Sequence, residues 1–115
     1  MKPLIFITFA VFAGLVYVPV SQSANLASNI CEYVAVDEKG RLRKLLKSNR
    51  LKLRNVFKDV SCDNDNILVF AAKKNAKEIG QLLIKKLPKD VIASELENLV
   101  SLSPQLAELA QARIN

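Results

Sequence analysis

The chain has 115 residues, of which 17 are Lys or Arg and 11 are Asp or Glu, and it contains no histidine and two cysteines. This length suits one small basic domain and excludes a multidomain enzyme. The absence of histidine excludes Ser-His-Asp and Cys-His nucleophiles, an imidazole general base and a His-bearing zinc site. The carboxylates Glu32, Asp37 and Glu78 follow no paired acid-base pattern. We therefore name no catalytic residue and expect neither enzymatic activity nor a cofactor.

Residues 1–23 have the layout of a secretory signal peptide. A lysine near the start is followed by the apolar run Leu4–Val18, which Pro19 interrupts before a short stretch of small polar residues. Small residues favour cleavage after Ser23, and cleavage after Ala24 is nearly as good. A bilayer span needs about 20 apolar residues, more than this run contains, which disfavours an uncleaved anchor. We expect an exported protein of the bacterial periplasm, with no transmembrane segment in its mature form.

The remaining residues, 24–115, are expected to form a single helical domain. A domain of this size buries only about 60–65 per cent of its unfolded surface and tends to be marginally stable. In an exported chain, Cys31 and Cys62 are more often bonded than free. A disulfide closing a loop of about 32 residues stabilises by roughly 3–4 kcal/mol in the chain-entropy model. The alternative is a pair of buried thiols.

Apolar residues in the first half recur at helical spacing. A first amphipathic face carries four residues at i, i+4, i+7 and i+8: Leu26, Ile30, Tyr33 and Val34. Asp37 then offers an N-cap for a second helix with Leu42, Leu45 and Leu46 on its apolar face. Two amphipathic helices are predicted here.

The second half continues the helical pattern. Asn66 precedes a helix with Ile67, Phe70 and Ala71, and Pro88 ends the next one, which carries Ile79, Leu82, Leu83 and Leu87. A further apolar face contains Ile92, Leu96, Leu99 and Val100. Ser103 and Pro104, as cap and first residue, begin a last helix with Leu106, Leu109, Ala110 and Arg113.

The predicted helices form pairs, and two pairs look alike. At an offset of 37 residues, 29–49 lies over 66–86 with five identities, and the matched positions are the predicted core positions. A third pair over 91–114 is compatible with this pattern. We expect an all-α fold of stacked helical hairpins, a short ankyrin-like or α-solenoid array of about three helix pairs.

The unusual feature is the basic segment, residues 39–58, which has nine basic residues and no acidic one. If the second helix continues past Asn49, four of the cations form one stripe at i+4 and i+3 spacing: Arg43, Lys47, Arg50 and Arg54. Residues 50–60 fit either a finger loop or a helix, and their later apolar spacing favours a helix. The candidate anion-binding or partner-binding residues are Arg41, Arg43, Lys44, Lys47, Arg50, Lys52, Arg54 and Lys58.

The basic segment supports two interpretations. It can bind phosphate-rich lipid headgroups, an envelope polymer or an acidic protein, or it is only a solvated amphipathic face. The lack of interleaved acids leaves like charges unrelieved, which favours a function. Nucleic acid is an unlikely partner, because export removes the protein from it and few aromatic residues are present to stack bases.

Residues 63–66, with the sequence Asp-Asn-Asp-Asn, resemble the start of a calcium loop. An EF-hand needs Gly and Glu further on, where Leu68 and Lys74 stand. This stretch indicates Asx-turn and N-cap chemistry instead, and no metal site is predicted.

Two resemblances can be named on these residues. Residues 65–87 resemble one ankyrin repeat, without the Thr-Pro-Leu-His start. Residues 26–90 resemble a small family of exported bacterial proteins, a domain of unknown function, through Cys-Glu-Tyr at 31–33, Lys52 to Asn55, Cys62 and Asn75 to Gly80. This resemblance implies export and a cysteine pair, and it implies no activity. We expect a periplasmic protein-interaction module, with an anionic membrane-surface or envelope-anion binder as the alternative.

Overall fold

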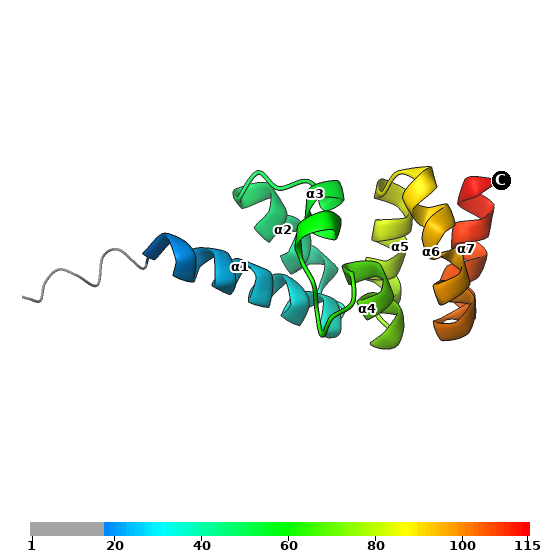
Figure 1. Ribbon diagram of the computed structural model, residues 1–115, viewed down its shortest axis with the longest axis horizontal. Helices are drawn as coiled ribbons and strands as arrows, with labels where there is room; N and C mark the ends of the chain where they lie inside the picture. The colour runs from blue at the N-terminus through cyan, green and yellow to red at the C-terminus, as the bar shows by residue number, and fades with distance from the viewer. Residues whose placement is uncertain (1–17) are drawn as a thin grey trace, which may run out of the picture.

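The structure is a computed structural model that describes residues 18–115, and this part of the chain is built from helices (Figure 1). The predicted all-α fold is confirmed. The helices are α1 (Val18–Ala35), α2 (Lys39–Ser48), α3 (Leu53–Asp59), α4 (Ile67–Lys73), α5 (Lys77–Lys86), α6 (Lys89–Leu102) and α7 (Pro104–Ile114).

The N-terminal segment is described only in part. Residues 1–17 of the predicted signal peptide lie outside the described residues. Helix α1 begins at Val18, so the backbone on both sides of the two predicted cleavage sites, after Ser23 and after Ala24, is helical. Pro19 lies within α1 and does not interrupt it in the described residues. Within residues 18–115, no helix combines the length and the apolarity needed to cross a membrane.

The helices form three hairpins that stack into two layers. Helices α1, α4 and α6 contact one another in sequence along one layer, and α2, α5 and α7 do so along the other. Figure 1 shows the hairpins following one another from the blue end to the red end of the molecule. The additional short helix α3 packs against α4 and α5. The predicted array of stacked helix pairs is therefore present.

One buried core runs through the stack. Ile30 and Val34 from α1 are buried together with Leu42 and Leu46 from α2, as the helical spacing predicts. Helix α4 buries its first six residues, because α1, α3, α5 and α6 surround it. Its sequence is accordingly apolar all round rather than amphipathic.

Two of the predicted caps are confirmed. The Asn66 side chain accepts a hydrogen bond from the Val69 N–H at 2.8 Å, at the start of α4. The Ser103 hydroxyl accepts from the Leu106 N–H at 3.4 Å, at the start of α7. Both bonds satisfy a backbone donor that has no partner within its helix.

The predicted cap at Asp37 is wrong in its target. Helix α2 is preceded by Glu38, whose side chain makes no capping bond. The Asp37 carboxylate instead accepts from the backbone N–H groups of Glu78 at 3.2 Å and Ile79 at 2.9 Å, at the start of α5. Asp37 therefore caps a helix of the next hairpin, about 40 residues away in the chain.

Three helices end with a left-handed residue. Asp37, Arg50 and Asn75 have φ of 56°, 54° and 59° and follow α1, α2 and α4. Each of these three turns has the paired backbone hydrogen bonds of the Schellman motif. Asn75 and Asp37 occupy equivalent places in their turns and are 38 residues apart. The second hairpin therefore has one more residue before its turn than the sequence offset of 37 predicts.

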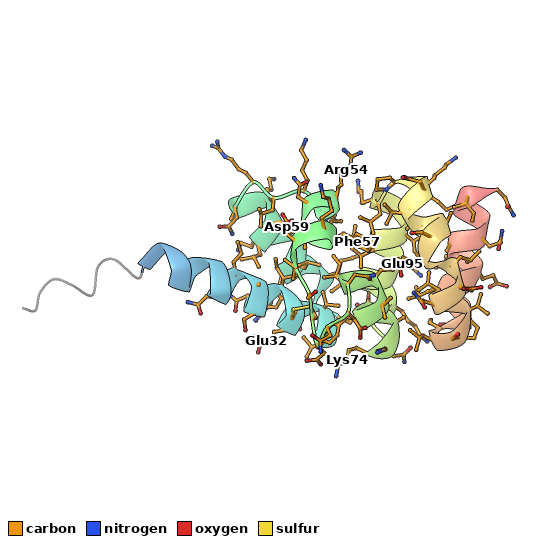
Figure 2. All side chains as sticks on the ribbon, in the orientation of Figure 1. Glu32, Arg54, Phe57, Asp59, Lys74 and Glu95 are labelled. Atoms are coloured by element: carbon orange, nitrogen blue, oxygen red, sulfur yellow. A yellow bond between two sulfur atoms is a disulfide. The ribbon has the colours of Figure 1, made fainter. Side chains whose placement is uncertain are left out.

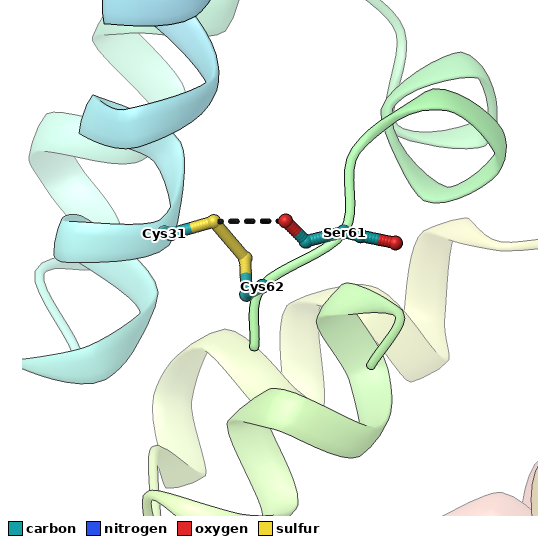
Figure 3. The surroundings of a disulfide bond; sticks show 3 residues. All are labelled: Cys31, Ser61 and Cys62. Atoms are coloured by element: carbon teal, nitrogen blue, oxygen red, sulfur yellow. Dashed lines mark hydrogen bonds between the residues drawn. A yellow bond between two sulfur atoms is a disulfide. The ribbon is translucent and has the colours of Figure 1, made fainter. Parts of the chain in front are cut away.

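The predicted disulfide is present. Cys31 of α1 is bonded to Cys62, which precedes α4, and their Cα atoms are 5.6 Å apart. Figure 3 shows the bond beside the backbone of Ser61. The Cys31 Sγ lies 3.7 Å from the Ser61 carbonyl oxygen, a contact rather than a hydrogen bond because a bonded sulfur carries no hydrogen. The bond ties the first hairpin to the turn that enters the second, as typically found in proteins of an oxidising compartment.

Candidate functional site

The basic segment is not one continuous helix. Helix α2 ends at Ser48, and Arg50 takes the left-handed conformation that closes the turn. The chain resumes as a helix at Leu53, so the preference for helix over residues 50–60 is correct for α3. The single stripe expected from a helix running past Asn49 is therefore absent, because the chain turns back between the two helices.

This turn creates a groove with an apolar floor. The groove has a volume of about 750 Å³ and lies between α2, the link that follows it, α3 and α5. Its floor is made only of leucine side chains, and Leu46 is buried while the other three are half-buried. These floor residues are Leu46, Leu51, Leu53 and Leu82. We call this hollow the basic groove.

Cationic side chains form the rim of the basic groove. Five come from the basic segment and one comes from α5, and all six residues are exposed. Figure 2 shows Arg54 above α3, on the side toward α5. The rim residues are Arg43, Lys44, Lys47, Lys52, Arg54 and Lys86.

The electrostatics of the groove are one-sided. No carboxylate lines it, and none of its six rim cations takes part in an ion pair within the described residues. Six like charges around one concave surface focus a positive potential and attract anions. Desolvation over the leucine floor strengthens these interactions relative to a flat surface.

The remaining predicted residues lie outside this groove. Arg41 lies 3.8 Å from the Glu38 carboxylate and belongs to a smaller hollow beside Tyr33. Arg50 and Lys58 are exposed but do not line the groove. The structure therefore brings together five of the eight candidate residues and leaves Arg41, Arg50 and Lys58 apart.

Two groove residues were missed by the sequence analysis. Leu82 and Lys86 belong to α5, and they complete the wall opposite α2. Leu82 is the repeat partner of Leu45, and Lys86 lies one turn beyond it on the same helical face. The repeat and this i+4 spacing were the available signals, but only packing shows that α2 and α5 are adjacent.

A neighbouring hollow between α2 and α5 is lined by the carboxylate of Glu78. Lys39 lies 3.5 Å from the Glu78 carboxylate there, and both side chains are partly exposed to solvent. An exposed pair of this kind contributes little, about 0–1 kcal/mol. It leaves the charge of the basic groove unchanged.

The acidic stretch 63–66 forms a turn. Asp63 and Asn64 are both left-handed, with φ of 53° and 69°, and they form a tight turn closed by two backbone hydrogen bonds between Cys62 and Asp65. Asp65 also pairs with Lys73 at 2.8 Å. Within the described residues, no group of three His, Cys, Asp or Glu side chains is arranged to hold a metal ion.

Comparison with known proteins gives a family. The model of the family described as "Protein of unknown function (DUF3718)" matches residues 30–94, a stretch that includes both cysteines and all groove residues. No curated protein and no solved structure matches the chain.

Proposed function

The chain belongs to this family of unknown function, and we propose from the groove that the protein is a non-enzymatic binding protein of the bacterial periplasm that associates with an anionic envelope surface. The observation that carries the proposal is the basic groove, with six cations, four leucines and no carboxylate. The disulfide and the signal-like N-terminal sequence support export to an oxidising compartment.

A bacterial membrane offers a surface that matches this charge. Each Lys or Arg near an anionic lipid surface contributes about 1 kcal/mol of attraction, which falls off within a Debye length. Several cations on one face therefore give measurable association without a membrane-spanning segment.

Sedimentation with vesicles tests the proposal. The oxidised protein should sediment with phosphatidylglycerol vesicles at low salt, much less at high salt, and not with phosphatidylcholine vesicles. Reversing three rim charges in the variant Arg43→Glu, Lys47→Glu, Arg54→Glu should weaken binding at least about 100-fold, given about 1 kcal/mol per cation.

A matched control has the same net charge with the reversals elsewhere. The variant Lys58→Glu, Lys77→Glu, Lys89→Glu changes three exposed lysines outside the groove. It should retain most of the binding if the groove is the contact surface. Equal losses in the two triple variants would show that net charge alone drives the association, and the groove would have no special part.

A second candidate is a protein-interaction module that uses the end of the stack. Three large apolar side chains are exposed on the last hairpin: Val100 at 60 per cent, Leu109 at 40 per cent and Leu102 at 37 per cent. No further hairpin covers this end of the described stack. The test is a pull-down from an envelope fraction, in which Val100→Lys and Leu109→Lys should release a partner that the groove variant retains.

A further inference from the structure

The side chains that line the basic groove have only two chemistries. All ten lining residues are leucine, lysine or arginine. The lining therefore offers an aliphatic surface and positive charge, and it contains no carboxylate, amide, hydroxyl or aromatic side chain. A ligand that fits needs an aliphatic part and an anionic part.

Attachment to lipid headgroups alone leaves the floor unexplained. Cations on an exposed helix face are sufficient for electrostatic association. Here, however, the cations surround a hollow of about 750 Å³ whose floor is aliphatic. Sites for small molecules have volumes of about 300–1,000 Å³ and are mostly apolar with a few polar groups.

The same lining disfavours other anionic ligands. A sugar or peptide carries hydrogen-bond donors, and no lining side chain can accept them. Nucleotide bases stack best on aromatic side chains, and none lines the groove. A fatty carboxylate has a chain that only needs apolar contact and a headgroup that only accepts hydrogen bonds.

We propose that the basic groove binds the aliphatic chain and the headgroup of one fatty carboxylate. The chain lies against the leucine floor, and the carboxylate accepts hydrogen bonds from the arginine and lysine side chains of the rim. Arg43 and Arg54 can each bind a carboxylate with two parallel bonds. This inference rests on the proposed function because it uses the same groove, but it adds a requirement for an aliphatic chain.

A chain-length series tests this requirement. Octanoate, decanoate and dodecanoate are titrated into the oxidised full chain by calorimetry, at fixed salt and below the micelle concentration. We expect one carboxylate bound per protein molecule, with affinity rising about threefold to fourfold for each added methylene. Dodecyl maltoside, which has the same chain and a neutral headgroup, should bind at least tenfold more weakly than dodecanoate.

Variants of the floor distinguish the groove from general apolar binding. Leu82 is half-buried in the floor and Leu109 is exposed outside it. Leu82→Gln should weaken dodecanoate about tenfold while leaving vesicle sedimentation nearly intact, and Leu109→Gln should change neither. Circular dichroism with and without the ligand shows that each variant is folded during the titration.

The outcomes separate this inference from the proposed function. The protein could bind vesicles while its affinity for the carboxylates neither depends on their chain length nor changes in Leu82→Gln. That result would overturn the fatty carboxylate site and leave the surface function standing. Saturable, chain-dependent binding without vesicle sedimentation would support the site and refute the surface function. Equal affinities for dodecyl maltoside and dodecanoate, or binding of many carboxylates per protein molecule, would overturn the site.

Discussion

Asp37 provides a sharp test of how the two hairpins are held together. Its carboxylate accepts two backbone hydrogen bonds at the start of α5, while its own backbone is left-handed with φ of 56°. Replacing Asp37 by alanine removes the cap and leaves a side chain that disfavours this conformation. Loss of a cap costs about 1 kcal/mol, up to about 2, and an alanine side chain in the left-handed conformation costs about 1 kcal/mol more.

Three substitutions separate these two effects. Asp37→Ala should lower the free energy of unfolding by about 2–3 kcal/mol. Asp37→Gly loses the cap but fits the backbone, so the loss should be about 1 kcal/mol. Asp37→Asn keeps one oxygen acceptor and tolerates the left-handed region, so it should also lose about 1 kcal/mol.

Asp63 is the matched control. It is also a left-handed aspartate, with φ of 53°, but its side chain makes no hydrogen bond or ion pair within the described residues. Asp63→Gly should therefore be neutral or stabilising by up to about 1 kcal/mol. Urea unfolding of the oxidised protein, followed by circular dichroism with unchanged m-values, measures all four variants. If Asp37→Gly changes the free energy of unfolding by the same amount as Asp63→Gly, the Asp37 carboxylate contributes no cap and the reasoning fails.

Three further predictions concern packing and helix ends, each checked by thermal unfolding, where 1 kcal/mol is about 4–8 °C for a domain of this size. Gly80→Ala should destabilise the protein by about 1 kcal/mol, because the new Cβ would lie 2.6 Å from a methyl group of the buried Leu106. The cost of overpacking, about 1–3 kcal/mol, exceeds the gain in helix propensity of about 1 kcal/mol. A rise in melting temperature would contradict this packing. Arg113→Ala should destabilise the protein by about 2–3 kcal/mol, because the guanidinium donates to the carbonyl oxygens of Ile84 at 2.7 Å and Leu87 at 2.8 Å, at the end of α5. An unchanged melting temperature would show that water replaces the guanidinium as the donor to these carbonyls. Arg50→Gly should stabilise by about 0.5–1 kcal/mol, because Arg50 is exposed and left-handed, and a loss would mean that its side chain makes a contact not seen here.

Much of the fold follows from local signals in the sequence. Apolar residues at helical spacing, together with the caps at Asn66 and Ser103, identify elements that each depend on a few neighbouring residues. The cap at Asp37 could not be found in this way. Its partners belong to α5, and a helix start accepts a cap from any carboxylate that the packing brings near it.

The basic groove, too, was predictable where it depends on local sequence and not where it depends on packing. The basic segment was visible in the sequence because nine cations occur without an acid. Its concave shape was not, because the break after α2 depends on Arg50 adopting a conformation that glycine or asparagine usually takes. Leu82 and Lys86 became part of the site only when α5 was placed beside α2.

The groove depends on restraints that lie outside its lining. The whole basic segment lies between the two bonded cysteines, so the disulfide closes the loop that carries most of the cations. Like charges on this loop repel one another, by a few tenths of a kcal/mol per pair, and favour a more open arrangement. The disulfide and the Asp37 cap oppose this, since one holds α1 to the entry of α4 and the other holds the α1–α2 turn to α5. A hollow whose walls repel each other but are fixed at both ends is suited to receive an anion, because the ligand relieves the repulsion without requiring the helices to move.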